Sequence, residues 1–239
     1  MSLPKLQTPE YILEVPSTGE EIKYRPFLVK EEKLLLIALE SEDQKQINNA
    51  IQDLVKSCTF DKIGHKDTPI FDIEFCFLKI RSKSVGEKST ISVTSPDDGK
   101  TKVDVTINYD DVKVQMNEKH SPEVKITDEI TLVMRYPTLH DAMLGSMADD
   151  KEISDTEQVF LMVRECMFEV HHKDDITNMV DVTDKEKDAF VGDMTNEQFA
   201  NIQEFFDTMP KLRHVVEFKN PKTKKKNEVL LEGLADFFD

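Results

Sequence analysis

The sequence predicts an α+β fold, with a helical core and small antiparallel β-hairpins at the N-terminus, in the middle and at the C-terminus. Two observations carry this prediction. Apolar and polar residues alternate near both ends of the chain and over residues 89–137, which is the period of a half-buried strand. Apolar residues at helical spacing fill the segments between. We expect three parts, residues 1–88, 89–137 and 138–239, packed as one interlocked body, because the terminal hairpin is too small to be stable alone.

The first part begins with a hairpin and continues as helices. Residues 10–27 alternate on both sides of a Pro-Ser-Thr-Gly turn. Helices are expected over residues 29–42, over residues 43–58 and after Thr68, which would cap a helix that starts at Pro69. Because residues 34–39 are apolar nearly all round, the first of these helices is expected to be buried.

The second and third parts return to strands and then to helices. Residues 89–137 are expected to form one antiparallel sheet with a buried face. Helices are then expected over residues 138–147, 155–171, 184–192 and 196–209, the last capped by Thr195, before a last hairpin that turns at Asn220-Pro221. There is no strong tandem repeat, although the hairpins at 90–107 and 214–231 each have a long turn containing proline.

The charge of the chain is strongly acidic and uneven. There are 47 Asp and Glu against 31 Lys and Arg, a formal net charge of −16, and residues 140–213 hold 18 acidic and 7 basic residues. Such an excess repels phosphate backbones, so we expect no nucleic-acid partner. A lysine cluster at residues 222–226 follows the acidic region. These charges are either solvated surfaces or complementary docking surfaces, for a partner or for the same protein in a ring.

The cysteines and the hydropathy indicate a protein made and used in a cytoplasm. Cys58, Cys76 and Cys166 are widely spaced in apolar, helix-like contexts, which predicts buried free thiols rather than disulfides. No apolar stretch approaches the roughly 18 residues of a membrane span, and no N-terminal run has the shape of a signal peptide. We therefore expect no membrane partner.

The sequence contains no recognisable catalytic motif, and we expect neither an enzyme nor a cofactor. There is no phosphate-binding glycine loop, no HExxH and no GxSxG, and the whole chain has only seven glycines. His171 and His172, followed by Asp174 and Asp175, resemble metal ligands, and a metal-dependent hydrolase using them is the alternative hypothesis. At the end of a helix the two histidines could instead satisfy the last carbonyl groups.

The C-terminal region combines a lysine cluster with aromatic residues. Two phenylalanines among the last three residues would be a solubility liability if they were left free. They dock either on the core of this protein or on a partner. The candidate partner-binding residues are Leu234, Phe237, Phe238, Lys222, Lys224, Lys225 and Lys226.

Several segments together resemble the T4-type phage baseplate hub assembly protein family. They are Leu3-Pro4-Lys5-Leu6, the hairpin Val15-Pro16-Ser17-Thr18-Gly19, residues 24–35 (YRPFLVKEEKLL), residues 75–87 (FCFLKIRSKSVGE) and residues 232–238 (EGLADFF).

The resemblance implies a late viral protein that acts in the cytoplasm of the infected host during tail assembly. Such a protein would help to build the central hub by binding other hub and tail proteins, without enzymatic activity, as an assembly scaffold or as a stable structural subunit. Some relatives carry cysteine pairs at hairpin turns in zinc-knuckle fashion. Because the turns at 95–101 and 220–227 lack cysteine here, we expect no zinc site.

Overall fold

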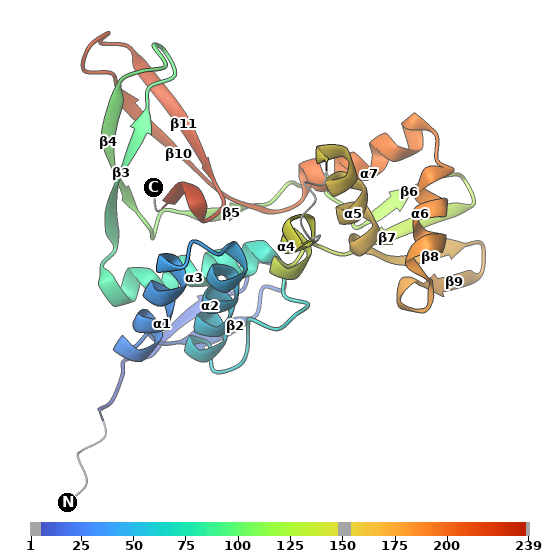
Figure 1. Ribbon diagram of the computed structural model, residues 1–239, viewed down its shortest axis with the longest axis horizontal. Coiled ribbons are helices and arrows are strands. Elements are labelled where there is room, and N and C mark those ends of the chain that lie inside the picture. The colour runs from blue at the N-terminus through green and yellow to red at the C-terminus, as the bar shows by residue number, and fades with distance from the viewer. Residues whose placement is uncertain (1–5, 148–153, 238–239) are drawn as a thin grey trace, which may run out of the picture. The chain divides into compact units, whose positions relative to one another are not determined.

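The chain folds into two compact units, which do not follow the order of the sequence (Figure 1). The structure is a computed structural model that describes residues 6–147 and 154–237, and it confirms the α+β fold class. Unit 1 comprises Met1–Gln115 and Lys211–Asp239, and unit 2 comprises Met116–Pro210. Whether the three parts expected from the sequence pack as one interlocked body stays a prediction.

Unit 1 opens with the expected hairpin of β1 (Tyr11–Glu14) and β2 (Glu21–Tyr24). The register pairs Leu13 with Ile22, and both side chains are buried on the inner face. Backbone hydrogen bonds close the turn: the N–H of Val15 donates to the carbonyl of Glu20, and that of Gly19 donates to the carbonyl of Val15. Gly19 adopts a positive φ of 69°, which is easily reached only without a Cβ.

Three helices follow, α1 (Val29–Glu40), α2 (Gln44–Cys58) and α3 (Ile70–Val85). Asp43 caps α2 by accepting hydrogen bonds from two backbone N–H groups of its first turn. The expectation that Thr68 caps α3 is wrong, because Pro69 occupies the cap position and no side chain caps the helix there. All three cysteines are free and buried, as expected.

Two further hairpins and a short strand complete unit 1. Strands β3 (Lys88–Thr94) and β4 (Lys102–Asn108) pair with each other. Strands β5 (Lys113–Gln115), β10 (Lys211–Lys219) and β11 (Lys226–Glu232) form a second sheet in the order β11-β10-β5, and the 3-10 turn η2 (Ala235–Phe237) follows. One core joins these strands to α3, and it includes Leu78, Ile91, Val105, Ile107, Leu212, Val216, Leu231 and Phe237.

Unit 2 is built on a four-stranded antiparallel sheet. Its strands are β6 (Glu123–Lys125), β7 (Ile130–Met134), β8 (Met167–His172) and β9 (Asp175–Asn178), in that order. The helical elements are α4 (Leu139–Met147), α5 (Asp155–Cys166), η1 (Met179–Asp181), α6 (Asp184–Gly192) and α7 (Asn196–Thr208). Thr195 caps α7 as expected.

Two expectations about these strands are wrong. The strands of residues 89–137 do not form one sheet, because β3 pairs only with β4, β5 joins the C-terminal hairpin, and β6 and β7 join β8. The helix expected over 155–171 ends at Cys166, and the following residues form β8, where Val170 pairs with Leu132. The tertiary ladder overrides a local pattern that fitted a helix. No helix of the described residues is long and apolar enough to cross a membrane.

Candidate functional site

A groove lies between α1 and α2 in unit 1. It has a volume of about 530 Å³. The two helices are joined by a short turn, so the start of α1 lies beside the end of α2. The residues that line the groove are Lys30, Glu31, Leu34, Ile37, Ala38, Gln46, Asn49, Ala50, Asp53, Leu54 and Ser57. The charges of Lys30 and Asp53 offset each other, and the remaining lining is mainly aliphatic and amide side chains.

Helix α1 exposes an unusual amount of apolar surface beside this groove. The expectation that residues 34–39 are buried is wrong, because only Ala38 among them is. The exposed fractions of five large residues lie between 49% and 81%: Val29, Leu34, Leu36, Ile37 and Leu39. Single exposed apolar residues are common on proteins, but five on one helix of 12 residues are unusual, and two of them, Leu34 and Ile37, line the groove.

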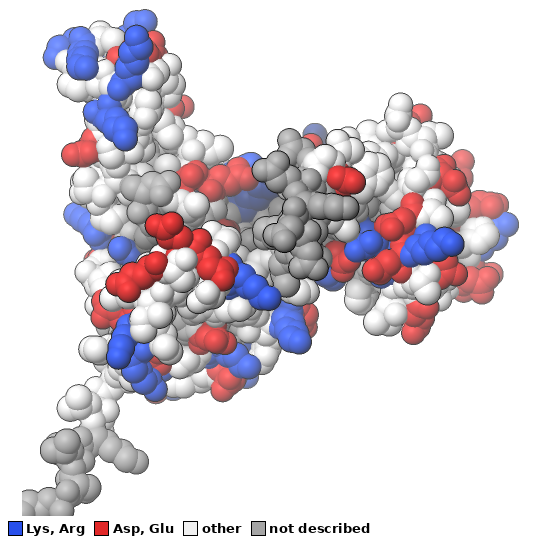
Figure 2. Space-filling view, in the orientation of Figure 1, with Lys and Arg blue, Asp and Glu red and all other residues white. Residues whose placement is uncertain are grey.

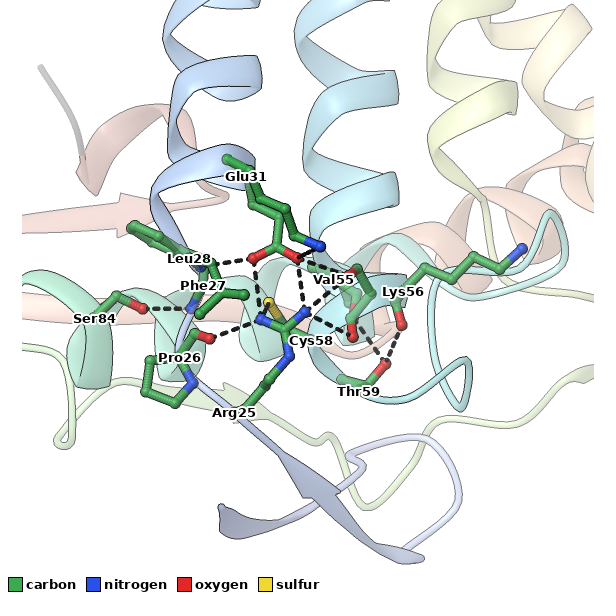
Figure 3. A network of polar contacts seen from close by, with 12 residues as sticks. Arg25, Pro26, Phe27, Leu28, Glu31, Val55, Lys56, Cys58, Thr59 and Ser84 are labelled. Carbon is green, nitrogen blue, oxygen red and sulfur yellow. Dashed lines mark hydrogen bonds and ion pairs between the residues drawn. The ribbon is translucent and has the colours of Figure 1, made fainter. Parts of the chain in front are cut away.

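An arginine–glutamate pair fixes the base of α1 against the end of α2 (Figure 3). The guanidinium of Arg25 donates to both carboxylate oxygens of Glu31, at 3.0 and 2.7 Å, and to the carbonyl of Pro26 at 2.9 Å. It also donates to the hydroxyl of Ser57 at 3.0 Å, and the backbone N–H of Arg25 donates to the carbonyl of Cys58 at 3.0 Å. Arg25 therefore holds together the end of β2, the start of α1 and the end of α2.

The Glu31 carboxylate is charged at the floor of the groove. Burial favours the neutral form, but the hydrogen bonds from Arg25, from the Leu28 N–H and from the Ser57 hydroxyl outweigh it and lower the pKa of Glu31 to about 2. The Leu28 bond, 2.6 Å long, also satisfies a free backbone donor at the start of α1. Glu31 is thus committed to holding the helix pair and is not available as a catalytic base.

The same junction recurs in unit 2. Arg135 follows β7 as Arg25 follows β2, and it donates to both carboxylate oxygens of Asp141 at 2.6 and 3.0 Å and to the next residue's carbonyl at 3.2 Å. Its backbone N–H donates to the carbonyl of Cys166, the last residue of α5. The carboxylate again accepts from the N–H three residues before it, that of Thr138. The sequence has no strong repeat, yet the same arrangement of hydrogen bonds occurs in both units.

The C-terminal candidates lie against the core of unit 1. Phe237 is 1% exposed and belongs to that core, and Leu234 is half-buried against it. The backbone N–H of Leu234 donates to the Glu74 carboxylate of α3 at 3.2 Å. Phe238 lies outside the described residues. In this conformation the Phe237 ring is not accessible to a partner, so a partner-binding role for the segment stays a prediction.

The four lysine candidates, Lys222 and Lys224 to Lys226, are all exposed and lie at the turn between β10 and β11. The structure brings this turn together with the one between β3 and β4, which sequence spacing could not have shown. The side-chain amide of Asn220 donates to the Ser95 hydroxyl at 3.1 Å and to the Asp97 carboxylate at 2.8 Å.

The histidine pair does not end a helix, as was expected, but lies on β8. Neighbouring side chains on a strand point to opposite faces. His171 contacts Glu169 at 2.9 Å, whereas the closest carboxylate contact of His172 is to Glu129 at 3.8 Å. Among the residues that the structure describes, no three His, Cys, Asp or Glu side chains are grouped to hold a metal ion. The placement therefore gives the hydrolase hypothesis no support.

Sequence reasoning did not find the groove, although a signal was present. The run of residues 34–39 has more apolar side chains than one buried helix face can use. A helix that is apolar all round is either enclosed by its own chain or left for a partner, and the sequence alone does not distinguish these cases.

Comparison with known proteins adds the family. A family model described as T4 bacteriophage base plate protein matches residues 8–239, nearly the whole chain. Neither the curated proteins nor the solved structures give a match. The match extends over both units, and it agrees with the resemblance seen in the segments at 24–35 and 75–87. The chain belongs to the T4 bacteriophage base plate protein family.

Proposed function

We propose that this chain is a non-enzymatic assembly protein for the central hub of the phage tail baseplate, which acts in the host cytoplasm by binding other hub and tail proteins. The family supports a role in the baseplate. The observation that carries the binding function is the exposed apolar side of α1 beside the α1–α2 groove. The hub-specific role rests on the sequence segments that resemble hub assembly proteins.

The groove best fits an amphipathic helix of another baseplate protein. Helix α1 has 12 residues and is therefore about 18 Å long, a length that suits a few helical turns of a partner. The exposed leucines and isoleucine supply the apolar contact, and Lys30 and Asp53 can orient a partner's charges at one end. A weakly charged helix suits this lining better than a strongly basic or acidic one.

Polar substitution on α1 tests the proposal. In Leu34→Gln/Ile37→Gln, both side chains line the groove and are more than half exposed, so the fold should survive while the apolar contact is lost. We expect affinity capture from infected cells to recover the other hub and tail proteins at least tenfold less efficiently, as quantified by mass spectrometry.

The matched control is Val215→Gln/Leu230→Gln, which replaces two exposed apolar residues of the β10–β11 hairpin and should capture the baseplate proteins as the parent does. Circular dichroism and thermal unfolding should be the same for both variants. If the α1 variant captures the same baseplate proteins in unchanged amounts, the groove is not their binding site. If the parent protein captures none of them, the hub assembly function itself is wrong.

A further inference from the structure

The turns of two hairpins form a single structure at one end of unit 1. Asn220 donates hydrogen bonds to Ser95, Asp97 and Asp98, at 3.1, 2.8 and 3.2 Å. The Thr223 hydroxyl also donates to Asp97. These bonds join residues more than 120 positions apart in the sequence, so both turns present their outer side chains together.

This end carries a cluster of lysines, visible as the blue group over the β3–β4 and β10–β11 turns in Figure 2. We define the lysine tip as the exposed residues Lys100, Lys102, Lys219, Lys222, Lys224, Lys225 and Lys226. Within the described part of the chain, none of the seven is within 4.0 Å of a carboxylate oxygen. The nearby carboxylates of Asp97 and Asp98 are engaged inside the turns, where hydrogen bonds from neighbouring side chains and backbone groups lower the pKa of each.

At some positions of the lysine tip, a residue other than lysine would make the hairpin more stable. Lys219 and Lys226 are directly opposite in the β10–β11 ladder, and like charges in that position destabilise the pairing. Lys224 has a φ of 64°, the same value as Gly99 at the matching position of the other turn. A residue that carries a Cβ is strained in this left-handed conformation. Two positions toward the base of the hairpin, Glu217 pairs with Glu228, so the positive charge is confined to the tip.

The complementary charge is in unit 2 of the same protein. Residues 116–210 contain 22 Asp and Glu against 8 Lys and Arg, a net of −14, which leaves only −2 of the total −16 to unit 1. We define the acidic surface as the exposed carboxylates on the β8–β9 turn, η1, α6 and the start of α7. These are Asp174, Asp175, Asp181, Asp184, Glu186, Asp188, Asp193 and Glu197.

We propose that the lysine tip of one copy docks on the acidic surface of unit 2 of a second copy. Two molecules of charge −16 repel each other in most orientations. Contact between tip and acidic surface is the orientation that places opposite charges together, and every copy offers both surfaces. The tip and the acidic surface are different parts of the chain, so the contact is heterologous. It builds a ring if the rotation closes and an open row if it does not.

Charge reversal on each side tests this contact with purified full-length protein alone, independently of any hub partner. The tip variant is Lys222→Glu/Lys224→Glu/Lys225→Glu/Lys226→Glu, and the acidic-surface variant is Asp174→Lys/Asp175→Lys/Asp181→Lys/Asp193→Lys/Glu197→Lys, which leaves five lysines against three carboxylates on that surface. Sedimentation velocity over a concentration series should show the parent associating at low salt. It should be monomeric in 1 M NaCl, where the Debye length falls to about 3 Å.

Each variant alone should be monomeric at every concentration, because its two surfaces then carry the same sign. An equimolar mixture of the two should associate again, since each reversed surface meets its complement on the other variant. The matched control, Lys45→Glu/Lys62→Glu/Lys66→Glu/Lys88→Glu, changes four exposed lysines of unit 1 outside the tip and should associate like the parent. Thermal unfolding checks that each variant is folded, and Lys→Gln at the four tip positions replaces a tip variant that is not.

Three results would overturn the proposal. The parent could remain monomeric at all concentrations in low salt, which would show that the tip does not bind a second copy. Association could persist in both variants, which would assign it to another surface. The tip could instead bind a short DNA duplex without any self-association, which would identify the lysines as a phosphate-binding surface.

Discussion

Glu74 is a half-buried carboxyl group that holds the C-terminal segment of unit 1. It accepts the hydrogen bond of the Leu234 N–H at 3.2 Å. Burial raises the pKa of Glu74 to about 7, the Leu234 hydrogen bond lowers it in part, and the nearby Glu232 raises it further. In the folded chain this carboxyl therefore binds its proton more tightly than an unfolded chain would.

The consequence is a loss of stability as the pH rises. Between the unfolded pKa of 4.5 and the folded pKa of about 7, the folded state holds more protons than the unfolded state, so the free energy of unfolding falls with increasing pH. Glu74→Gln keeps a hydrogen-bond acceptor and removes the charge. We expect it to raise the free energy of unfolding by about 1–3 kcal/mol at pH 8 and by much less at pH 4.5.

Urea denaturation of parent and variant from pH 4 to pH 8 measures this difference directly. Asp72, whose pKa is also raised by burial, is present in both proteins and cancels from the comparison. A difference that does not change with pH would show that Glu74 is charged in the folded state.

At this scale the sequence indicates which residues are buried more reliably than what they contact. Cys58, Cys76 and Cys166 are buried as expected. Phe237 is buried too, which agrees with one of its two alternatives, docking on the core of this protein. Arg25 and Glu31 were visible only as two charges six residues apart. Their pairing depends on a strand end and two helices that meet in space, which no local period encodes.

At the scale of elements, an arginine–carboxylate pair joins a strand end to helix ends in both units. The side chains of Arg25 and Glu31 are 11% and 7% exposed, so removing the guanidinium leaves a buried charge without its partner. We expect Arg25→Met to cost about 3–5 kcal/mol and to expose the backbone amides of α1 and α2 to hydrogen exchange.

The corresponding arginine of unit 2, Arg135, provides the control for Arg25→Met. Arg135→Met should increase exchange in α4 and α5 and leave α1 and α2 protected, because its partner Asp141 is in unit 2. The double variant Arg25→Met/Glu31→Leu should recover much of the lost stability, since an apolar pair can replace a buried ion pair. If the double variant is as unstable as Arg25→Met alone, the cost is not that of an unpaired carboxylate.

Elements were mostly predicted well where local chemistry decides, although the expected cap at Thr68 was wrong. The hairpin turns, the cap at Thr195 and the helix over 184–192 follow from turn residues and helix formers. Prediction was wrong where a ladder partner decides. Residues 167–171 fit a helical stripe locally, but β7 pairs with them and makes them a strand. The distribution of the middle strands over three sheets likewise depends on contacts distant in sequence.

At the scale of the whole molecule, unit 2 is inserted between two paired strands of unit 1. Gln115, the last residue of β5, and Lys211, the first residue of β10, are partners in one antiparallel register. The chain therefore leaves unit 1 and returns to it at adjacent positions. Replacing residues 116–210 with a two-residue Asn-Gly turn should join β5 to β10 as an ordinary hairpin.

We expect this shortened chain to fold as unit 1, because its α3 and hairpin core contains no residue of unit 2. A cooperative thermal transition and slow hydrogen exchange in α3, β10 and β11 would show this. A chain without a cooperative transition would mean that unit 1 requires unit 2 in order to fold.

The place of β10, β11 and Phe237 in the core also determines when unit 1 can close. The core of unit 1 combines residues of α3 and β3–β4 with residues of β10, β11 and η2, which are synthesised after unit 2. While β10 and β11 have not been made, α3 and β3–β4 are present but lack the strands that cover them. Unit 2 has all of its residues before this point and can fold first. A translation product that stops before β10 would therefore lack a finished core in unit 1, and with it a stable support for the α1–α2 groove.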